Sequence, residues 1–132
     1  MTTAPTAPRR RQSKEHSEQT RFVMKVRTFH PEVLCAAIPN GAAVTAAQRL
    51  RLTHEGMMPG FPDLVLFAAG LAPLAIEMKT DTGKTSKEQT HCHDALRDRG
   101  VAVHVCRSCE EAYATMLKWL ETSTNNQRRI FE

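Results

Sequence analysis

Hydrophobic side chains recur along the chain with two different spacings, which predict helices alternating with strands. Over residues 15–29 the spacing is helical, and the apolar stripe consists of Phe22, Val26 and Phe29. A short apolar run over residues 33–38 is typical of a buried strand, and Pro31 separates it from the helix. Residues 43–55 again favour a helix, which Gly56 ends.

The middle of the chain carries two apolar runs that predict a β-hairpin. They cover residues 63–67 and 74–79, and Ala69-Gly70 is a turn signal between them. The chain then continues with a helix, a strand and a helix, at residues 86–100, 101–106 and 108–121. This order predicts an α/β fold with a mixed central β-sheet flanked by helices.

The positive charge of the chain is concentrated near its N-terminus. Arg9, Arg10, Arg11 and Lys14 precede the first acidic residue and account for the whole formal net charge of +4. We therefore expect residues 1–14 to form a disordered basic arm that contacts the phosphate backbone of DNA. A tail that only aids solubility would have the same composition. The predicted domain covers residues 15–121, and residues 122–132 form a polar C-terminal tail.

Composition also limits the environment and the metal chemistry. The chain has neither an apolar run of membrane-spanning length nor a secretory signal, so we expect a cytoplasmic protein with reduced cysteines. The His91-Cys92-His93 triplet, together with Cys106 and Cys109, raises the alternative of a zinc site. However, His91 and His93 are about 200° apart around a helix axis, and the cysteines lack the spacing of a structural zinc site.

Three polar residues at the hairpin carry the candidate chemistry. Residues two apart in a strand point to one face, so Glu77 and Lys79 project together, and the hairpin brings Asp63 beside them. Two converging carboxylates are costly unless a cation is bound, and the carbonyl of Met78 adds a neutral oxygen ligand. We therefore predict hydrolysis of phosphodiester bonds with Mg²⁺ or Mn²⁺, in which Lys79 orients water or stabilises developing charge.

The pattern Pro62-Asp63…Glu77-Met78-Lys79 resembles that of the PD-(D/E)XK nuclease superfamily and, more narrowly, of the VRR-NUC domain. This short pattern alone arises often by chance. The likeness, however, runs from about Glu15 to Leu120 and includes several further marks in the same order. These marks are Glu18, Pro39-Asn40-Gly41, Gly56, Pro59-Gly60-Phe61, Ser86-x-x-Gln89 and Gly100-Val-Ala-Val.

The resemblance implies a restriction-endonuclease-like core and a metal-dependent deoxyribonuclease, with endonuclease action favoured over exonuclease action. It implies that Asp63 and Glu77 are metal ligands, that Lys79 is catalytic, that Glu18 is a further acidic ligand and that Gln89 is a polar member of the site. A place in phage or bacterial replication, repair or recombination is also implied.

Several of these residues have a simpler explanation. Glu18 would also fit a solvated helix position, and Gln89 fills the reciprocal position of a capping box with Ser86. Lys84 and Lys87 either contact phosphate or are ordinary surface charges.

Small domains of this kind resemble structure-specific nucleases that act as dimers on branched DNA, such as four-way junctions or flaps. A short chain has little surface for reading bases, whereas phosphate contacts can read the shape of a branched duplex. A homodimer would present two active sites to a two-fold junction. The alternatives are a DNA-binding accessory module that does not cut and a sequence-specific restriction endonuclease.

Overall fold

Helices and strands alternate in the predicted order. The computed structural model describes residues 7–39 and 44–131 of the chain. The elements are α1 (Ala7–Phe29), β1 (Leu34–Ala37), α2 (Ala46–His54), β2 (Leu64–Phe67), β3 (Leu74–Met78), α3 (Lys87–Asp98), β4 (Ala102–Cys106) and α4 (Cys109–Phe131). The predicted α/β class is confirmed.

The strands form one mixed sheet in the order β1-β2-β3-β4. Strands β1, β2 and β3 pair antiparallel, and Leu64 of β2 lies opposite Ile76 of β3, which is the predicted hairpin. Strands β3 and β4 are parallel. A parallel pair requires a crossover connection, and α3 provides it. Every residue of β3 is buried, so this strand lies at the centre of the molecule.

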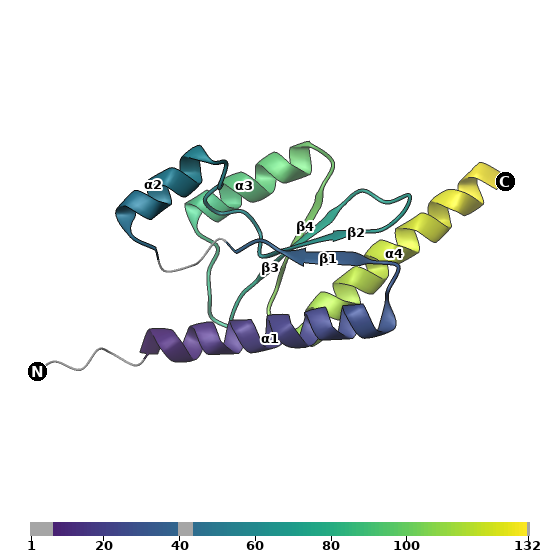
Figure 1. Ribbon diagram of the computed structural model, residues 1–132. Coiled ribbons are helices and arrows are strands. Elements are labelled where there is room, and N and C mark those ends of the chain that lie inside the picture. The colour runs from purple at the N-terminus through teal and green to yellow at the C-terminus, as the bar shows by residue number, and fades with distance from the viewer. Residues whose placement is uncertain (1–6, 40–43, 132) are drawn as a thin grey trace, which may run out of the picture.

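Helices α1 and α4 pack together against one face of the sheet, and α3 contacts β4 from the other side (Figure 1). The core between the α1–α4 layer and the sheet includes Phe22, Val26, Leu64, Leu66, Ile76, Met116 and Trp119. Helix α2 buries no residue. None of the helices in the described ranges is long and apolar enough to cross a membrane.

One residue of the predicted apolar stripe is not part of the core. Phe22 and Val26 are fully buried, whereas Phe29 is 66% exposed. Phe29 is the last residue of α1, and the chain leaves the helix immediately after it. The helical period therefore identified the correct face of α1 but could not show where the sheet stops covering that face.

Both long helices extend further than the sequence indicated. Helix α1 begins at Ala7, so residues 7–14 are helical and not a disordered arm. Pro8 suits the first turn of a helix, and Arg, Gln and Lys favour helix within it. The remainder of the expected arm, residues 1–6, lies outside the described ranges. Helix α4 continues through the expected polar tail to Phe131, because no proline or glycine follows Gly100.

Gly60 allows the loop before β2 to touch the first turn of α3. Its backbone has a left-handed φ of 82°, and a Cβ atom added there would collide with the backbone of Glu88 and Gln89. Gly70 also has a left-handed φ, of 77°, but a Cβ atom at that position would meet nothing within 4 Å. A side chain at Gly70 would therefore cause only backbone strain, whereas a side chain at Gly60 would cause both backbone strain and a collision with α3.

Gly60→Ala should destabilise the protein clearly more than Gly70→Ala. Gly70→Ala introduces only left-handed strain and should lower the free energy of unfolding by about 1 kcal/mol. Gly60→Ala adds a backbone collision and should lower it by roughly 2–4 kcal/mol. Urea denaturation followed by circular dichroism measures both values. Equal losses in the two variants would contradict close packing of Gly60 against α3.

Candidate active site

The ends of β2 and β3 bring the predicted acidic pair together. Asp63 immediately precedes Leu64 and Glu77 immediately follows Ile76, and Leu64 and Ile76 are partners in the sheet. Asp63 Oδ2 accepts a hydrogen bond of 2.8 Å from the backbone N–H of Met78. Lys79 Nζ lies 3.9 Å from Glu77 Oε1. Asp63, Glu77 and Lys79 thus meet at one end of the hairpin.

Gln89 joins this group from the first turn of α3. Its backbone N–H donates to Ser86 Oγ and its side-chain Oε1 accepts from the Ser86 N–H, which completes the predicted capping box. The amide nitrogen of its side chain, Nε2, donates a hydrogen bond of 3.0 Å to Glu77 Oε1. The two explanations considered for Gln89 are therefore compatible, since one side chain caps the helix and also contacts the acidic pair.

The acidic pair is held in an unfavourable electrostatic setting. The side chain of Glu77 is only 5% exposed. Burial, with the nearby charge of Asp63, raises the pKa of Glu77 to about 8, although Lys79 lowers it. Burial also raises the pKa of Asp63, against the opposing hydrogen bond from Met78. Both shifts indicate a site that holds two ionised carboxylates only when a positive charge compensates them.

The donor set fits a hard divalent cation. Asp63 and Glu77 supply carboxylate oxygens, and Glu77 Oε2 is buried without a hydrogen-bond partner. Within the described ranges, no three His, Cys, Asp or Glu side chains are grouped closely enough to hold an ion by themselves. Water and phosphate oxygens would therefore complete the coordination, as is common for Mg²⁺. The carbonyl of Met78 remains a predicted ligand.

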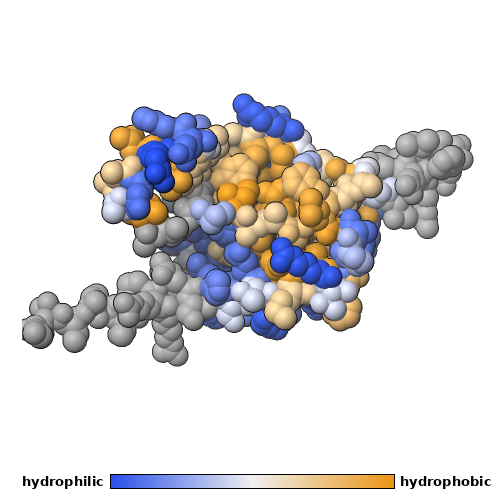
Figure 2. Space-filling model, viewed as in Figure 1, coloured by the Kyte–Doolittle hydropathy of each residue, from blue (hydrophilic) through white to orange (hydrophobic). Residues whose placement is uncertain are grey.

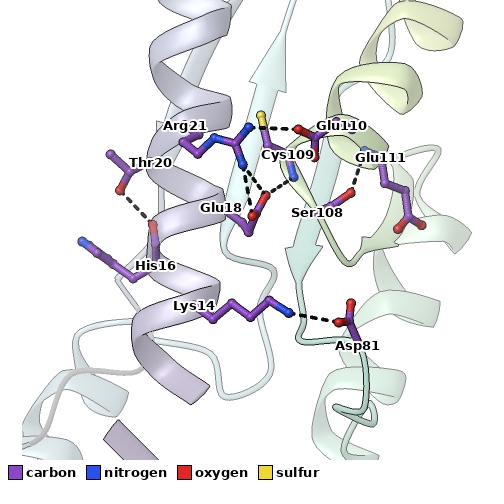
Figure 3. Close-up of polar contacts among 10 residues, drawn as sticks. All are labelled: Lys14, His16, Glu18, Thr20, Arg21, Asp81, Ser108, Cys109, Glu110 and Glu111. Carbon is purple, nitrogen blue, oxygen red and sulfur yellow. Dashed lines mark hydrogen bonds and ion pairs between the residues drawn. The ribbon is translucent and has the colours of Figure 1, made fainter. Parts of the chain in front are cut away.

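Glu18, the acidic residue that the sequence assigned to this site from α1, is engaged elsewhere. Its Oε2 accepts a hydrogen bond of 2.6 Å from the backbone N–H of Cys109, at the start of α4. Its Oε1 pairs with Arg21 at 3.2 Å, and Arg21 also pairs with Glu110 at 2.9 Å (Figure 3). Glu18 therefore connects α1 to the N-terminal end of α4.

Glu15, one helical turn earlier, reaches the backbone just after β3, the strand that carries Glu77. Its Oε1 accepts a hydrogen bond of 3.2 Å from the backbone N–H of Thr80, the residue that follows Lys79. Burial is the main cause of the raised pKa values of Asp63 and Glu77, and the charge of Glu15 adds to both. Glu15 could not be singled out from the sequence, because two glutamates one turn apart on a helix give the same periodic signal.

The loop after β3 is fixed by cations. Arg107 Nη1 donates to the carbonyl oxygens of Thr80 at 2.6 Å and of Gly83 at 2.7 Å. Lys14 Nζ pairs with Asp81 at 3.0 Å, as Figure 3 shows. Arg107 could not be singled out from the sequence, because no local pattern indicates a cation that binds backbone carbonyls.

For the other basic residues predicted to bind nucleic acid, the structure shows exposure at most. Lys84 and Lys87 are exposed, on the loop after β3 and at the start of α3. The side chains of Arg9, Arg10 and Arg11 lie outside the part of the chain whose side chains are described. Contact between any of these residues and nucleic acid therefore remains a prediction.

His93 was not assigned to the site from the sequence, but it lies beside Glu77. Its Nε2 is 3.9 Å from Glu77 Oε2, and its side chain is buried. Burial is the main cause of the lowered pKa of His93. His91, in contrast, is exposed, so these two histidines lie on different sides of α3.

The raised pKa of Glu77 predicts a pH-dependent stability in the absence of metal. With a pKa of about 8, Glu77 retains its proton in the folded protein up to about pH 8, whereas the unfolded chain releases it near the ordinary glutamate pKa of 4.5. The folded state therefore binds more protons between these values, and stability falls as pH rises through this window. With a chelator present, this fall should be at least about 2 kcal/mol larger in wild type than in Glu77→Gln between pH 5 and pH 8. Urea denaturation at both pH values tests this, and parallel profiles would refute it.

Comparison with known proteins identifies the family and the fold of the chain. A family model for the VRR-NUC domain matches residues 7–110. A solved structure described as a "VRR_NUC domain protein" superposes with a TM-score of 0.66 at 16% sequence identity. The match covers 82% of this chain and 88% of that chain, and it supports the fold. A search of curated proteins found no match. The family match covers most of the chain and includes the Asp63–Glu77–Lys79 cluster, so this protein belongs to the VRR-NUC family of nuclease domains.

Proposed function

We propose that the protein is a divalent-cation-dependent deoxyribonuclease that acts as an endonuclease on branched DNA. The observation that carries this proposal is the acidic pair formed by the partly buried Asp63 and the buried Glu77, with Lys79 and Gln89 directed at the Glu77 carboxylate. A buried glutamate close to a second carboxylate is expensive in a role that is only structural. Nuclease activity follows from family membership, whereas the cation and the substrate are the proposed refinements.

Asp63, Glu77 and the carbonyl of Met78 would hold the cation, either Mg²⁺ or Mn²⁺. When bound, the cation would neutralise the scissile phosphate and lower the pKa of a coordinated water. In place of Glu18, we propose Glu15 as the glutamate of α1 that supports the site, because it binds the backbone directly after Lys79.

The protein's own side chains would position the reacting groups. Lys79 is largely buried and close to Glu77, so its ammonium group is available to orient water or to stabilise charge on the phosphate. Gln89 fixes one oxygen of Glu77, and its own position is fixed by the cap with Ser86. Side chains held by such contacts need less reorganisation during reaction.

The proposed preference for branched DNA rests on the small size of the domain. Residues 7–39 and 44–131 contain no insertion that offers an extra surface for base recognition, so shape and phosphate contacts are the more economical mode. A homodimer would suit a two-fold junction. Leu34 of the edge strand β1 and its partner Phe67 are exposed. Figure 2 displays hydrophobic side chains in the region of β1 and β2, which would suit a second copy of the chain.

Cleavage assays with labelled DNA test this proposal. We expect Mg²⁺- or Mn²⁺-dependent cuts near the branch point of four-way junctions or flaps, with weaker cleavage of linear duplex or single strands. Asp63→Ala and Lys79→Ala should each lower cleavage by about 100-fold or more. Lys118→Ala, which changes an exposed lysine of α4, is the matched control and should be unaffected. DNA binding without cleavage would favour an accessory module, and cleavage of linear duplex at one sequence would favour a restriction endonuclease.

Glu15→Gln and Glu18→Gln form a matched pair. The first tests whether Glu15 contributes to cleavage, and the second tests whether Glu18 contributes to the stability of the fold. Glu15→Gln should lower cleavage about 10-fold or more, as is typical for residues that orient catalytic groups. Glu18→Gln should leave cleavage within about 2-fold and lower the free energy of unfolding by about 1 kcal/mol, since it weakens the contact with α4. Rate measurements and urea denaturation check both outcomes. The reverse assignment of the two effects would restore Glu18 as the site residue.

A further inference from the structure

Helix α3 presents one side chain to each oxygen of the Glu77 carboxylate. Gln89 and His93 are four residues apart, so they lie on the same side of the helix. Gln89 Nε2 donates to Glu77 Oε1 at 3.0 Å. His93 Nε2 faces Glu77 Oε2 at 3.9 Å. The first contact is a hydrogen bond, and the second is about 1 Å too long to be one.

Both atoms of the longer contact are buried and unpaired. The side chains of His93 and Glu77 are 3% and 5% exposed. His93 Nε2 and Glu77 Oε2 both lack a hydrogen-bond partner, and Thr80 Oγ1 is the third such side-chain atom in the described ranges. Leaving a buried polar atom unpaired costs about 1–3 kcal/mol, so two such atoms that face each other call for an explanation.

We propose that His93 is a positioning residue of the nuclease site, an inference that rests on the proposed function. Its Nε2–H group donates a hydrogen bond to Glu77 Oε2 when the Glu77 carboxylate binds a divalent cation. The carboxylate is then held by Gln89 at one oxygen and by His93 at the other, with Lys79 nearby. Such outer partners orient metal-binding carboxylates, and their loss typically costs 10–100-fold in metal affinity or activity.

Two substitutions of His93 by side chains of similar length test whether His93 acts by hydrogen bonding or by packing. His93→Gln retains an N–H donor near the position of Nε2, whereas His93→Met fills a similar volume without a donor. His91→Met makes the same chemical change at an exposed histidine of the same helix and is the control.

Binding of Mn²⁺ to the full chain without DNA, followed by the electron paramagnetic resonance signal of free Mn²⁺, is the primary measurement. We expect the dissociation constant to rise about 10-fold or more in His93→Met and to stay within about 3-fold of wild type in His93→Gln. His91→Met should match wild type. Without metal, His93→Met should be at least as stable as wild type, because the substitution removes an unpaired buried nitrogen. If His93 served only to pack the core, His93→Met would instead be less stable than wild type without metal.

Nitrogen-15 NMR of the histidine rings provides a direct readout. With Mg²⁺ bound, His93 Nε2 should carry a proton, and an unprotonated Nε2 would overturn the inference. Wild-type Mn²⁺ affinity in His93→Met would also overturn it, and if wild type still cleaves DNA, the proposed function survives. If the wild-type protein neither binds Mn²⁺ nor cleaves DNA, the proposed function fails and the inference fails with it.

Discussion

The buried carboxylate of Glu77 is the group on which the arrangement of the site depends. It lies near the end of β3, a strand in which every residue is buried, where an uncompensated charge is costly. The surrounding residues supply part of the compensation, through the amide of Gln89 and the ammonium group of Lys79. One carboxylate oxygen remains unpaired beside His93. Because burial raises the pKa of Glu77 to about 8, this carboxylate is ionised at neutral pH only when a further positive charge is present, which is the physical basis for expecting a bound cation.

The topology of the sheet explains why these groups meet. Because β3 and β4 are parallel, the chain must cross over between them, and α3 makes this crossover. The first turn of α3 therefore lies near the end of β3, where Glu77 is located. Ser86 fixes the start of this helix, and Gly60 lets the loop that carries Asp63 approach the same turn. The support of the site is consequently distributed over segments that are far apart in sequence.

The elements and the central cluster could be predicted because their signals are local. The hairpin that unites Asp63 with Glu77 joins neighbouring strands, so the alternation of side chains along each strand was sufficient. The Ser86–Gln89 capping box is likewise contained in four consecutive residues. The sequence-based predictions were wrong where a local pattern did not show how far an element or its buried face extends. The apolar period of α1 did not indicate that Phe29 is exposed, and charge alone suggested disorder where α1 is already helical.

The sequence by itself determined the order of the elements and the meeting of Asp63, Glu77 and Lys79, since periodicity and turn residues act over a few positions. Only the tertiary structure decided that Glu15 rather than Glu18 contacts the chain just after β3, because packing sets the position of α1 along the sheet. It also placed His93 against Glu77 and directed Arg107 to the loop after β3. These contacts join segments that are far apart in sequence, so the spacing of residues along the chain could not predict them.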